Sequence, residues 1–237
     1  MPTSIKLLIY LAVWRRPEIT KLCFIGINRL KKHPLYDITS FAVISEPEMI
    51  PLCEEYGIKW VMHQNYPLGK KKNYGLKACS QYDFDYLMEI GSDDLITNQM
   101  LNHYLKYFDK YDFFGISDVV YVESETGECR RLSNKATTYG AGRIIKREIL
   151  EELNWKIWSD DLNRGLDNDS IRRIESKGYK FHKTEPMEEP GLIDIKSNEN
   201  IWKFNYFLGV PYDFKKLMSL LSEPEINCLN QLQNAGA

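Results

Sequence analysis

Two adjacent carboxylates, Asp93 and Asp94, follow an apolar run in the segment MEIGSDDLIT. Like charges at this separation repel, and the repulsion is poorly screened near a protein core. A solvated turn would accommodate the pair without any function. A bound Mg²⁺ or Mn²⁺ would instead resolve the repulsion, since these ions take carboxylate oxygens and share them with substrate phosphates. The pair alone leaves both interpretations open.

A basic segment, GKKKNYGLKA, opens a predicted helix upstream of this pair. Its first turn carries Lys70, Lys71 and Lys72, which face the positive end of the helix dipole at a cost of roughly 0.3–1 kcal/mol each when exposed. A solvated basic turn is one interpretation. The other is an anion such as a diphosphate at the helix N-terminus, with Gly69 allowing close approach and Asn73 donating. The segment lacks the GxxxxGK[ST] pattern of a P-loop. A phosphate site here favours a metal at the neighbouring carboxylate pair.

A further carboxylate, Asp167, lies at the start of another predicted helix in the segment LDNDSIRRIESKGYKF. Asp167 or Asn168 fits the N-cap of that helix. Asp169 and Arg173 have the i,i+4 spacing of a helical ion pair. In the functional interpretation, Asp167 projects into a cleft as a general base. Both interpretations remain open from the residues alone.

The four histidines, His33, His63, His103 and His182, show neither HxxH nor HExxH spacing. A zinc site is therefore not expected. His182, at the end of a predicted strand, is a candidate additional ligand for the metal.

An alternation of strands and helices must position these side chains. The first half predicts strands followed by helices, in the order Lys6–Val13, Pro17–Lys32, Phe41–Ser45, Pro47–Tyr56, Lys59–His63, Lys70–Ser80, Tyr86–Ile90 and Asn98–Phe108. This order indicates an α/β fold with a mainly parallel sheet. The second half predicts a hairpin of Phe113–Val122 with Cys129–Leu132, helices over Arg147–Leu153 and Asp169–Lys177, and short strands over Tyr179–Lys183 and Leu192–Ile195.

The composition restricts the class of protein. The chain has 237 residues, 43% of them hydrophobic, which is enough for one domain with a real core. A net charge of −2 gives no global case for nucleic-acid binding. Five dispersed cysteines without a CxxC pair fit reduced core thiols and a cytoplasmic location. No stretch approaches the roughly 18 apolar residues of a membrane span, and the N-terminal apolar run is short enough to be a first strand rather than a signal peptide.

Ligands of open parallel sheets bind beyond the carboxyl ends of the strands. Four polar segments are expected at that edge, namely WRRPE, SEPE, HQNYPLGKKKNYG and GSDD, each following one of the first four strands. Their clustering indicates one binding cleft.

In order and spacing these motifs resemble the GT-A fold nucleotide-sugar glycosyltransferases, nearest the large inverting family 2 found in many bacteria. The resemblance covers roughly residues 5–185 and rests on Trp14, Arg15 and Arg16; Ser45 and Glu46; Asn65, Gly69, Asn73, Gly75 and Leu76; Ser92, Asp93 and Asp94; Gly140, Ala141, Gly142 and Arg143; and Asp167, Asp169 and Arg173. The chain departs from the family at two positions. Gly91 stands where many members have the first Asp of Asp-x-Asp, and Leu166 replaces the acidic residue before the base.

The resemblance implies a single GT-A domain: residues 1–110 bind the nucleotide sugar, 111–200 form the acceptor and catalytic part, and 201–237 are a helical extension. It implies metal-dependent transfer of a sugar from a nucleoside diphosphate sugar, with inversion and Asp167 as the base. Asp93 and Asp94 would hold Mn²⁺ or Mg²⁺, with His182 as the extra ligand. The expected donor-binding residues are Trp14, Arg15, Arg16, Glu46, Gly69, Lys70, Lys72, Asn73, Ser92, Asp93 and Arg143.

The acceptor is left open as a glycan, a lipid-linked group, a protein or a modified nucleic-acid base. Two rival functions are a sugar-phosphate nucleotidylyltransferase and a non-catalytic nucleotide- or carbohydrate-binding relative. The first needs a Gly-rich loop after strand one, whereas LAVWRRPE contains no Gly. The second is compatible with Leu166 beside the expected base.

Overall fold

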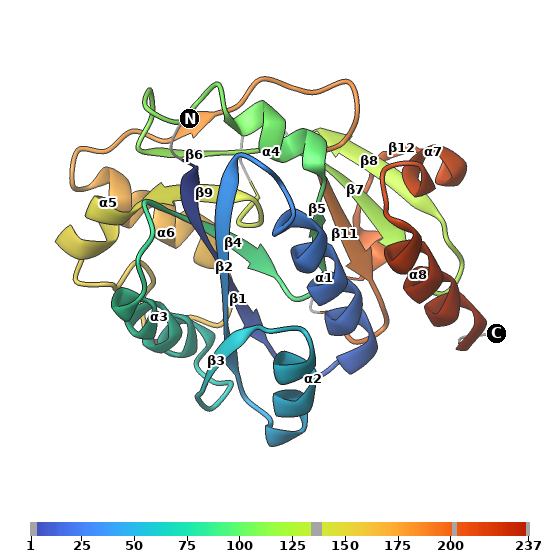
Figure 1. Ribbon diagram of the computed structural model, residues 1–237, viewed down its shortest axis with the longest axis horizontal. Helices are drawn as coiled ribbons and strands as arrows, with labels where there is room; N and C mark the ends of the chain where they lie inside the picture. The colour runs from blue at the N-terminus through green and yellow to red at the C-terminus, as the bar shows by residue number, and fades with distance from the viewer. Residues whose placement is uncertain (1–3, 134–138, 201–202, 236–237) are drawn as a thin grey trace.

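The computed structural model describes residues 4–133, 139–200 and 203–235. A seven-stranded sheet, in the order β10-β6-β9-β4-β1-β2-β3, runs through its centre (Figure 1). Its strands are β1 (Ile5–Val13), β2 (Tyr36–Ile44), β3 (Lys59–Met62), β4 (Tyr86–Gly91), β6 (Phe113–Gly115), β9 (Arg143–Lys146) and β10 (His182–Lys183). β1 pairs in parallel with β2 and β4, and β2 with β3, while β9 is antiparallel to β4 and β6. The predicted mainly parallel α/β sheet is confirmed.

Helices cover both faces of this sheet, because successive residues of a strand point to opposite faces and both faces of β1 are apolar. Leu7, Ile9 and Leu11 pack against one set of helices, and Leu8 and Tyr10 against another. The first set is α1 (Pro17–Leu30), α2 (Ile50–Glu55) and α4 (Asn98–Tyr104), and the second is α3 (Leu68–Ala78), α5 (Arg147–Glu152) and α6 (Leu166–Glu175). Short 3₁₀ turns occur at Pro47–Met49, Cys79–Gln81 and Phe204–Tyr206.

A second, five-stranded sheet lies beside the first, in the order β12-β8-β7-β11-β5. Its strands are β5 (Asp94–Ile96), β7 (Asp118–Glu123), β8 (Cys129–Ser133), β11 (Leu192–Lys196) and β12 (Val210–Pro211). A separate apolar core joins this sheet to α1, α7 (Phe214–Met218) and α8 (Glu223–Ala235), which Figure 1 shows together at the C-terminal side. β5 directly follows β4, so the chain passes from one sheet to the other at the Asp93 turn.

The second half differs from the prediction in several elements. The strand expected over Phe113–Val122 is split into β6 and β7, which belong to different sheets. β5, β9 and β12 were not predicted, because two to four residues carry too little periodicity to identify a strand. The C-terminal segment is therefore not purely helical, since β12 precedes α7 and α8. All five cysteines are buried free thiols, as expected.

Candidate active site

A cavity of about 240 Å³ lies beyond the carboxyl ends of β1 and β4. The loop after β1, the start of α3, the turn after β4 and the segment after β11 form its walls. Among the residues predicted to bind the donor, Trp14, Arg15, Arg16, Ser92 and Asp93 border it. The cavity therefore lies at the carboxyl ends of the strands, where the sequence predicted the binding site.

The loop after β1 adopts an unusual backbone. Arg15 and Arg16 both have left-handed conformations, with φ of 56° and 54°, which cost of order 1–3 kcal/mol at a non-glycine residue. The turn is held because the Arg15 amide donates to Glu46 Oε2 at 2.8 Å. It directs the Arg16 guanidinium inward, where it donates to Asp93 Oδ2 at 2.9 Å and Ser92 Oγ at 3.3 Å. Glu46 therefore orients the loop that Arg16 uses to reach the acidic turn.

Three carboxylates meet beside the cavity, which Asp93 borders. Oxygens of Asp93, Asp94 and Asp194 all lie within 4.8 Å of one another. Asp194 comes from β11, which is antiparallel to β5 and sets Asp194 directly opposite Asp94. Sequence reasoning missed Asp194. The polar residues in LIDIK were the available signal, but only the β5–β11 pairing brings them to the site.

The environment separates the pKa values of these carboxylates. Burial and the repulsion from Asp194 and Asp93 hold the pKa of Asp94 well above its ordinary value. Burial likewise raises the pKa of Asp194 to about 6, against the nearby Lys196. Burial acts in the same direction on Asp93, but the Arg16 guanidinium and Lys196 outweigh it and lower the pKa of that carboxyl. Asp93 is therefore the carboxylate held most firmly in its charged form.

The cluster suits a hard divalent cation. Its donors are carboxylate oxygens, the ligands that Mg²⁺ and Mn²⁺ prefer. Asp194 Oδ1 is buried and has no hydrogen-bond partner among the described residues, so it is available as a ligand. His182 does not join this cluster. It pairs with Phe114 at the far edge of the main sheet, and its ring stacks on Tyr111 at 3.6 Å. This corrects the expected ligand set, in which Asp194 takes the place given to His182.

The three lysines of α3 point in different directions. Lys70 is exposed. Lys72 turns to the buried Glu89, with which it forms an ion pair, and lies 4.1 Å from the centre of the Trp158 ring. Lys71 alone of the three borders the cavity, with its ammonium donating to Val13 O at 2.6 Å and Asn65 Oδ1 at 3.1 Å. The expectation for Lys70 and Lys72 is corrected, because neither is among the described residues that border the cavity, whereas Lys71 is.

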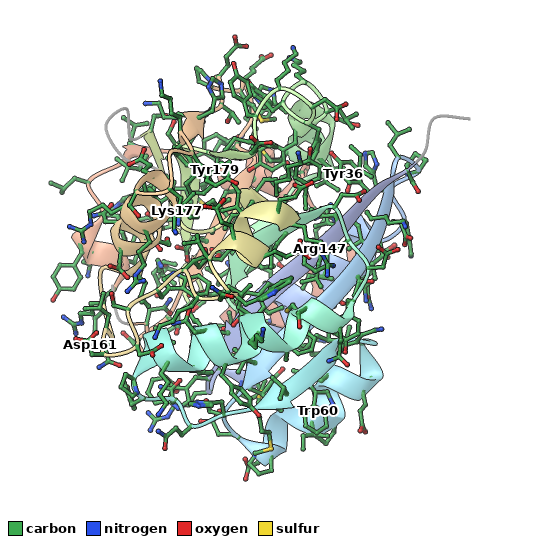
Figure 2. The ribbon with its side chains drawn as sticks, turned by 90° about the vertical axis from the view of Figure 1, so that its left-hand side faces the viewer. Tyr36, Trp60, Arg147, Asp161, Lys177 and Tyr179 are labelled. Carbon is green, nitrogen blue, oxygen red and sulfur yellow. The ribbon has the colours of Figure 1, made fainter. Side chains whose placement is uncertain are left out.

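The N-terminus of α3 is covered by protein rather than open to an anion. The Gly69 amide donates to Leu162 O at 2.8 Å, and the Leu68 amide to Asn163 Oδ1 at 2.9 Å. A Cβ at Gly69 would lie 2.0 Å from Ser159 O. Figure 2 shows Asp161, from this same loop, at the end of α3. Gly69 thus allows a loop, not a phosphate, to approach the helix.

Asn73 belongs to the same loop contact. Its amide nitrogen donates to Trp158 O and Asp160 Oδ1, both at 2.7 Å, and its oxygen accepts from the Trp158 amide at 3.2 Å. These bonds account for the buried amide, so Asn73 positions the loop and does not border the cavity among the described lining residues. The expected donor contact of Asn73 is corrected accordingly.

The predicted base, Asp167, lies in the first turn of α6, and the N-cap is Gly165 rather than Asp167 or Asn168. Its carboxylate is exposed and packs beside Gly140, where a Cβ would approach Asp167 Oδ1 to 2.3 Å. Asp167 is not among the described residues bordering the cavity. The neighbouring pair is confirmed, since Arg173 Nε lies 3.6 Å from Asp169 Oδ2.

Arg143 is fully buried and serves the framework around Asp167. It donates to Ser170 Oγ at 2.6 Å and lies 3.9 Å from Glu89 Oε2. It therefore ties β9 and β4 to α6. The expectation that Arg143 lines the donor or acceptor side is not met in this cavity, because the side chain is directed into the protein.

Comparison with solved structures decides the fold. TarS from S. aureus (residues 1–349) superposes with a TM-score of 0.59 at 12% identity, over 81% of this chain and 60% of that one. The mannosyltransferase PcManGT from Pyrobaculum calidifontis, solved with GDP-Man and Mn²⁺, gives a TM-score of 0.58 at 11% identity, over 86% of this chain and 60% of that one. The chain has the GT-A-like glycosyltransferase fold.

This GT-A-like chain spans about 60% of the length of each of those two structures. No family model matches its sequence, and no curated protein shows significant similarity to it. The likeness is therefore one of fold. Within the part of the chain that the structure describes, we find no helix with the length and apolar character needed to cross a membrane.

Proposed function

We propose that this chain is a metal-dependent glycosyltransferase that uses a nucleoside diphosphate sugar as its donor. One observation supports this most directly: on a GT-A-like fold, oxygens of three carboxylates lie within 4.8 Å of one another, and one of the three, Asp93, borders a cavity that Arg16 and Lys71 also border. A site with carboxylates for a divalent ion and cations for a phosphate matches the charge pattern of a diphosphate donor.

In this proposal, different residues around the cavity contact different parts of the donor. Arg16 and Lys71 face the diphosphate. Trp14 and Tyr66, whose rings meet edge to face at 5.7 Å at the cavity wall, contact the nucleoside. GDP-mannose, the donor present in the PcManGT structure, is one of the donors to test, and the acceptor is not specified by these contacts.

The reaction is a displacement at the anomeric carbon. The acceptor hydroxyl oxygen forms the new bond as the bond from the anomeric carbon to the phosphate oxygen breaks, and Asp167 takes the hydroxyl proton. Attack opposite the leaving group inverts the configuration. Asp93, Asp94 and Asp194 would hold a divalent ion, whose positive charge would stabilise the departing diphosphate. Arg16, which contacts Asp93, and Lys71 add to that stabilisation.

A thermal-shift panel tests the donor assignment. Nucleoside diphosphates and sugar nucleotides are added with and without Mn²⁺, and a shift that needs both components is expected for at least one of them. The matched variant is Asp93→Ala, which should lose this shift, with Asp161→Ala, an exposed carboxylate outside the cluster, as its control. Absence of any Mn²⁺-dependent shift in the wild type would overturn the proposal.

Donor hydrolysis without acceptor separates a transferase from the rival non-catalytic binding relative. Slow release of free sugar is expected from the enzyme, because water can replace the acceptor hydroxyl. Binding of a sugar nucleotide with no hydrolysis and no transfer to any acceptor would favour the binding protein. Leu166, at the position where the resemblance to family 2 implies an acidic residue, packs in the apolar core beneath α6.

A further inference from the structure

We propose that Lys196 is a built-in counter-cation of the acidic cluster, which a divalent metal displaces and which then faces the donor diphosphate. This inference rests on the proposed function, since it concerns how the same site loads its metal and donor. It assigns a role to a residue outside all of the motifs that indicated the glycosyltransferase fold.

The position of Lys196 follows from strand geometry. Residues two apart on a strand share a face, so Asp194 and Lys196 of β11 point to the same side. The Lys196 ammonium lies 2.7 Å from Asp194 Oδ2, and the side chain is only 8% exposed. It also borders the cavity together with Asp93. One side chain therefore contacts both the carboxylates and the space for the donor.

Two aromatic rings hold the ammonium in this place. Tyr121 and Phe207 stack on each other at 3.8 Å, and the Lys196 nitrogen lies 5.3 Å and 5.2 Å from their centroids. Such contacts favour a cation. The lysine therefore has a second set of favourable contacts that do not depend on Asp194.

The charge balance explains why the lysine must move. In the described structure, Asp93 pairs with Arg16 and Asp194 pairs with Lys196, so two cations already lie beside the three carboxyl groups. A divalent ion among the carboxylates would lie beside the Lys196 ammonium, and like charges repel strongly where water is excluded. Asp194 Oδ1, which lacks a partner among the described residues, offers the entering ion a first contact while Oδ2 still holds the lysine.

Arg16 is less suited to this exchange. It is anchored through Asp93 and Ser92 together and lies on a backbone turn fixed by Glu46. Lys196 has one ion pair on a flexible stem. Metal and diphosphate binding are then coupled: the metal takes the carboxylate from the lysine, and the freed ammonium increases the attraction for the diphosphate.

The experiment measures Mn²⁺ binding by electron paramagnetic resonance, with MnCl₂ alone and with GDP or UDP present. Lys196→Met keeps the apolar stem against the aromatic rings and removes the charge. It is expected to bind Mn²⁺ alone at least fivefold more tightly than the wild type, and to gain less affinity when the nucleotide is added. Lys215→Met, an exposed lysine on α7, controls for net charge and should match the wild type. Lys196→Gln, a second neutral variant, should behave like Lys196→Met.

A measurement on the wild type does not depend on the variants folding. Saturating Mg²⁺ should increase the rate of reductive methylation at Lys196 relative to Lys215, as quantified by peptide mass spectrometry. An unchanged relative rate overturns the inference, as does a folded Lys196→Met protein that binds Mn²⁺ no more tightly than the wild type. If wild-type protein binds no Mn²⁺ with or without nucleotide, the metal-dependent function fails together with this inference. Normal metal-dependent donor binding with no effect at Lys196 overturns the inference alone.

Discussion

Asp194 shows how a single residue changes the interpretation of the acidic turn. Asp93 and Asp94 alone form a local pair, but β11, far along the chain, adds a third carboxylate beside them through its pairing with β5. Pairing between β5 and β11 fixes Asp94 and Asp194 relative to each other, and Arg16 holds Asp93 in the turn that precedes β5.

Asp194→Asn tests this third ligand. The variant keeps the size of the side chain and loses the charge, so the affinity for Mn²⁺ with GDP or UDP present should fall by at least about tenfold, the lower range for changes around metal ligands. Isothermal titration calorimetry measures the affinity. Asp161→Asn, an exposed residue at the end of α3, should leave it unchanged. Equal affinities for the two variants would remove Asp194 from the ligand set.

Lys71 predicts a pH dependence of donor binding. Burial lowers the pKa of its ammonium to about 7, helped by Lys72 and opposed by Glu46. Lys71 is thus a cation at the cavity below pH 7 and loses its charge above it. Nucleoside diphosphate affinity should fall in the wild type relative to Lys71→Met as the pH rises through 7. The difference between the two proteins removes the titration of the nucleotide itself. A difference in affinity between the two proteins that stays constant with pH would contradict the role of Lys71 as a titrating cation at the cavity.

The same shift has a consequence for stability with a defined sign. The unfolded chain binds the Lys71 proton up to its ordinary pKa of 10.5, whereas the folded chain releases it near 7. Since the unfolded state binds more protons in this window, this side chain makes the free energy of unfolding rise with pH from about 7 to 10.5. Urea denaturation at several pH values should show that the free energy of unfolding rises less with pH in Lys71→Met than in the wild type.

Asp167→Asn addresses the base. The amide cannot accept the acceptor proton, so turnover should fall by about 10²–10⁴-fold, while donor binding is retained because Asp167 is not among the described residues bordering the cavity. A coupled assay for released nucleoside diphosphate measures turnover, and thermal shift measures donor binding. Unchanged turnover would exclude Asp167 as the base.

At the scale of elements, the sequence pattern at the start of α3 predicted a position near the cavity correctly, but not the contacts that the helix start makes there. A glycine before three lysines suggested a phosphate-binding helix start, yet the loop of residues 159–163 covers that end. Gly69→Ala should destabilise the fold by about 1–3 kcal/mol, because its Cβ would overlap Ser159 O. Lys70→Ala, one position on and exposed, is the control. Urea denaturation compares them, and equal stabilities would show that the loop can move aside.

The elements that the sequence predicted are those with long periodic patterns. β1, α1, β3, α3 and β4 lie close to their expected bounds, because burial on a central sheet imposes apolar runs of a definite length. β5 and β9 escaped prediction because strands of three or four residues are defined by pairing partners far away in the chain. The acidic turn and the Arg16 loop were therefore predictable, whereas Asp194, Lys196 and the true direction of each lysine depended on tertiary contacts.

At the scale of the whole molecule, the second sheet supplies Asp94 and Asp194, two of the three carboxylates of the acidic cluster, so the contacts that hold this sheet govern the site. It packs against α1, α7 and α8 through its own apolar core. Arg29 of α1 binds the fully buried Glu225 of α8 through two hydrogen bonds of 2.9 and 3.0 Å, and also donates to Ile96 O of β5 at 2.7 Å. One arginine thus joins the C-terminal helix, the first helix and the strand that carries Asp94.

Removing one partner of the Arg29–Glu225 pair should lower the free energy of unfolding, because it leaves the other partner as a poorly solvated charge. Glu225→Ala should lower the free energy of unfolding by about 3–5 kcal/mol, as measured by urea denaturation. Glu223→Ala changes an exposed acidic residue at the start of the same helix and is the matched control. It should lower the free energy of unfolding by much less than Glu225→Ala does. The double variant Arg29→Met with Glu225→Leu should recover part of the loss, since apolar groups can replace a buried ion pair. A cost for Glu225→Ala no larger than that for Glu223→Ala would show that α8 is dispensable for the second sheet.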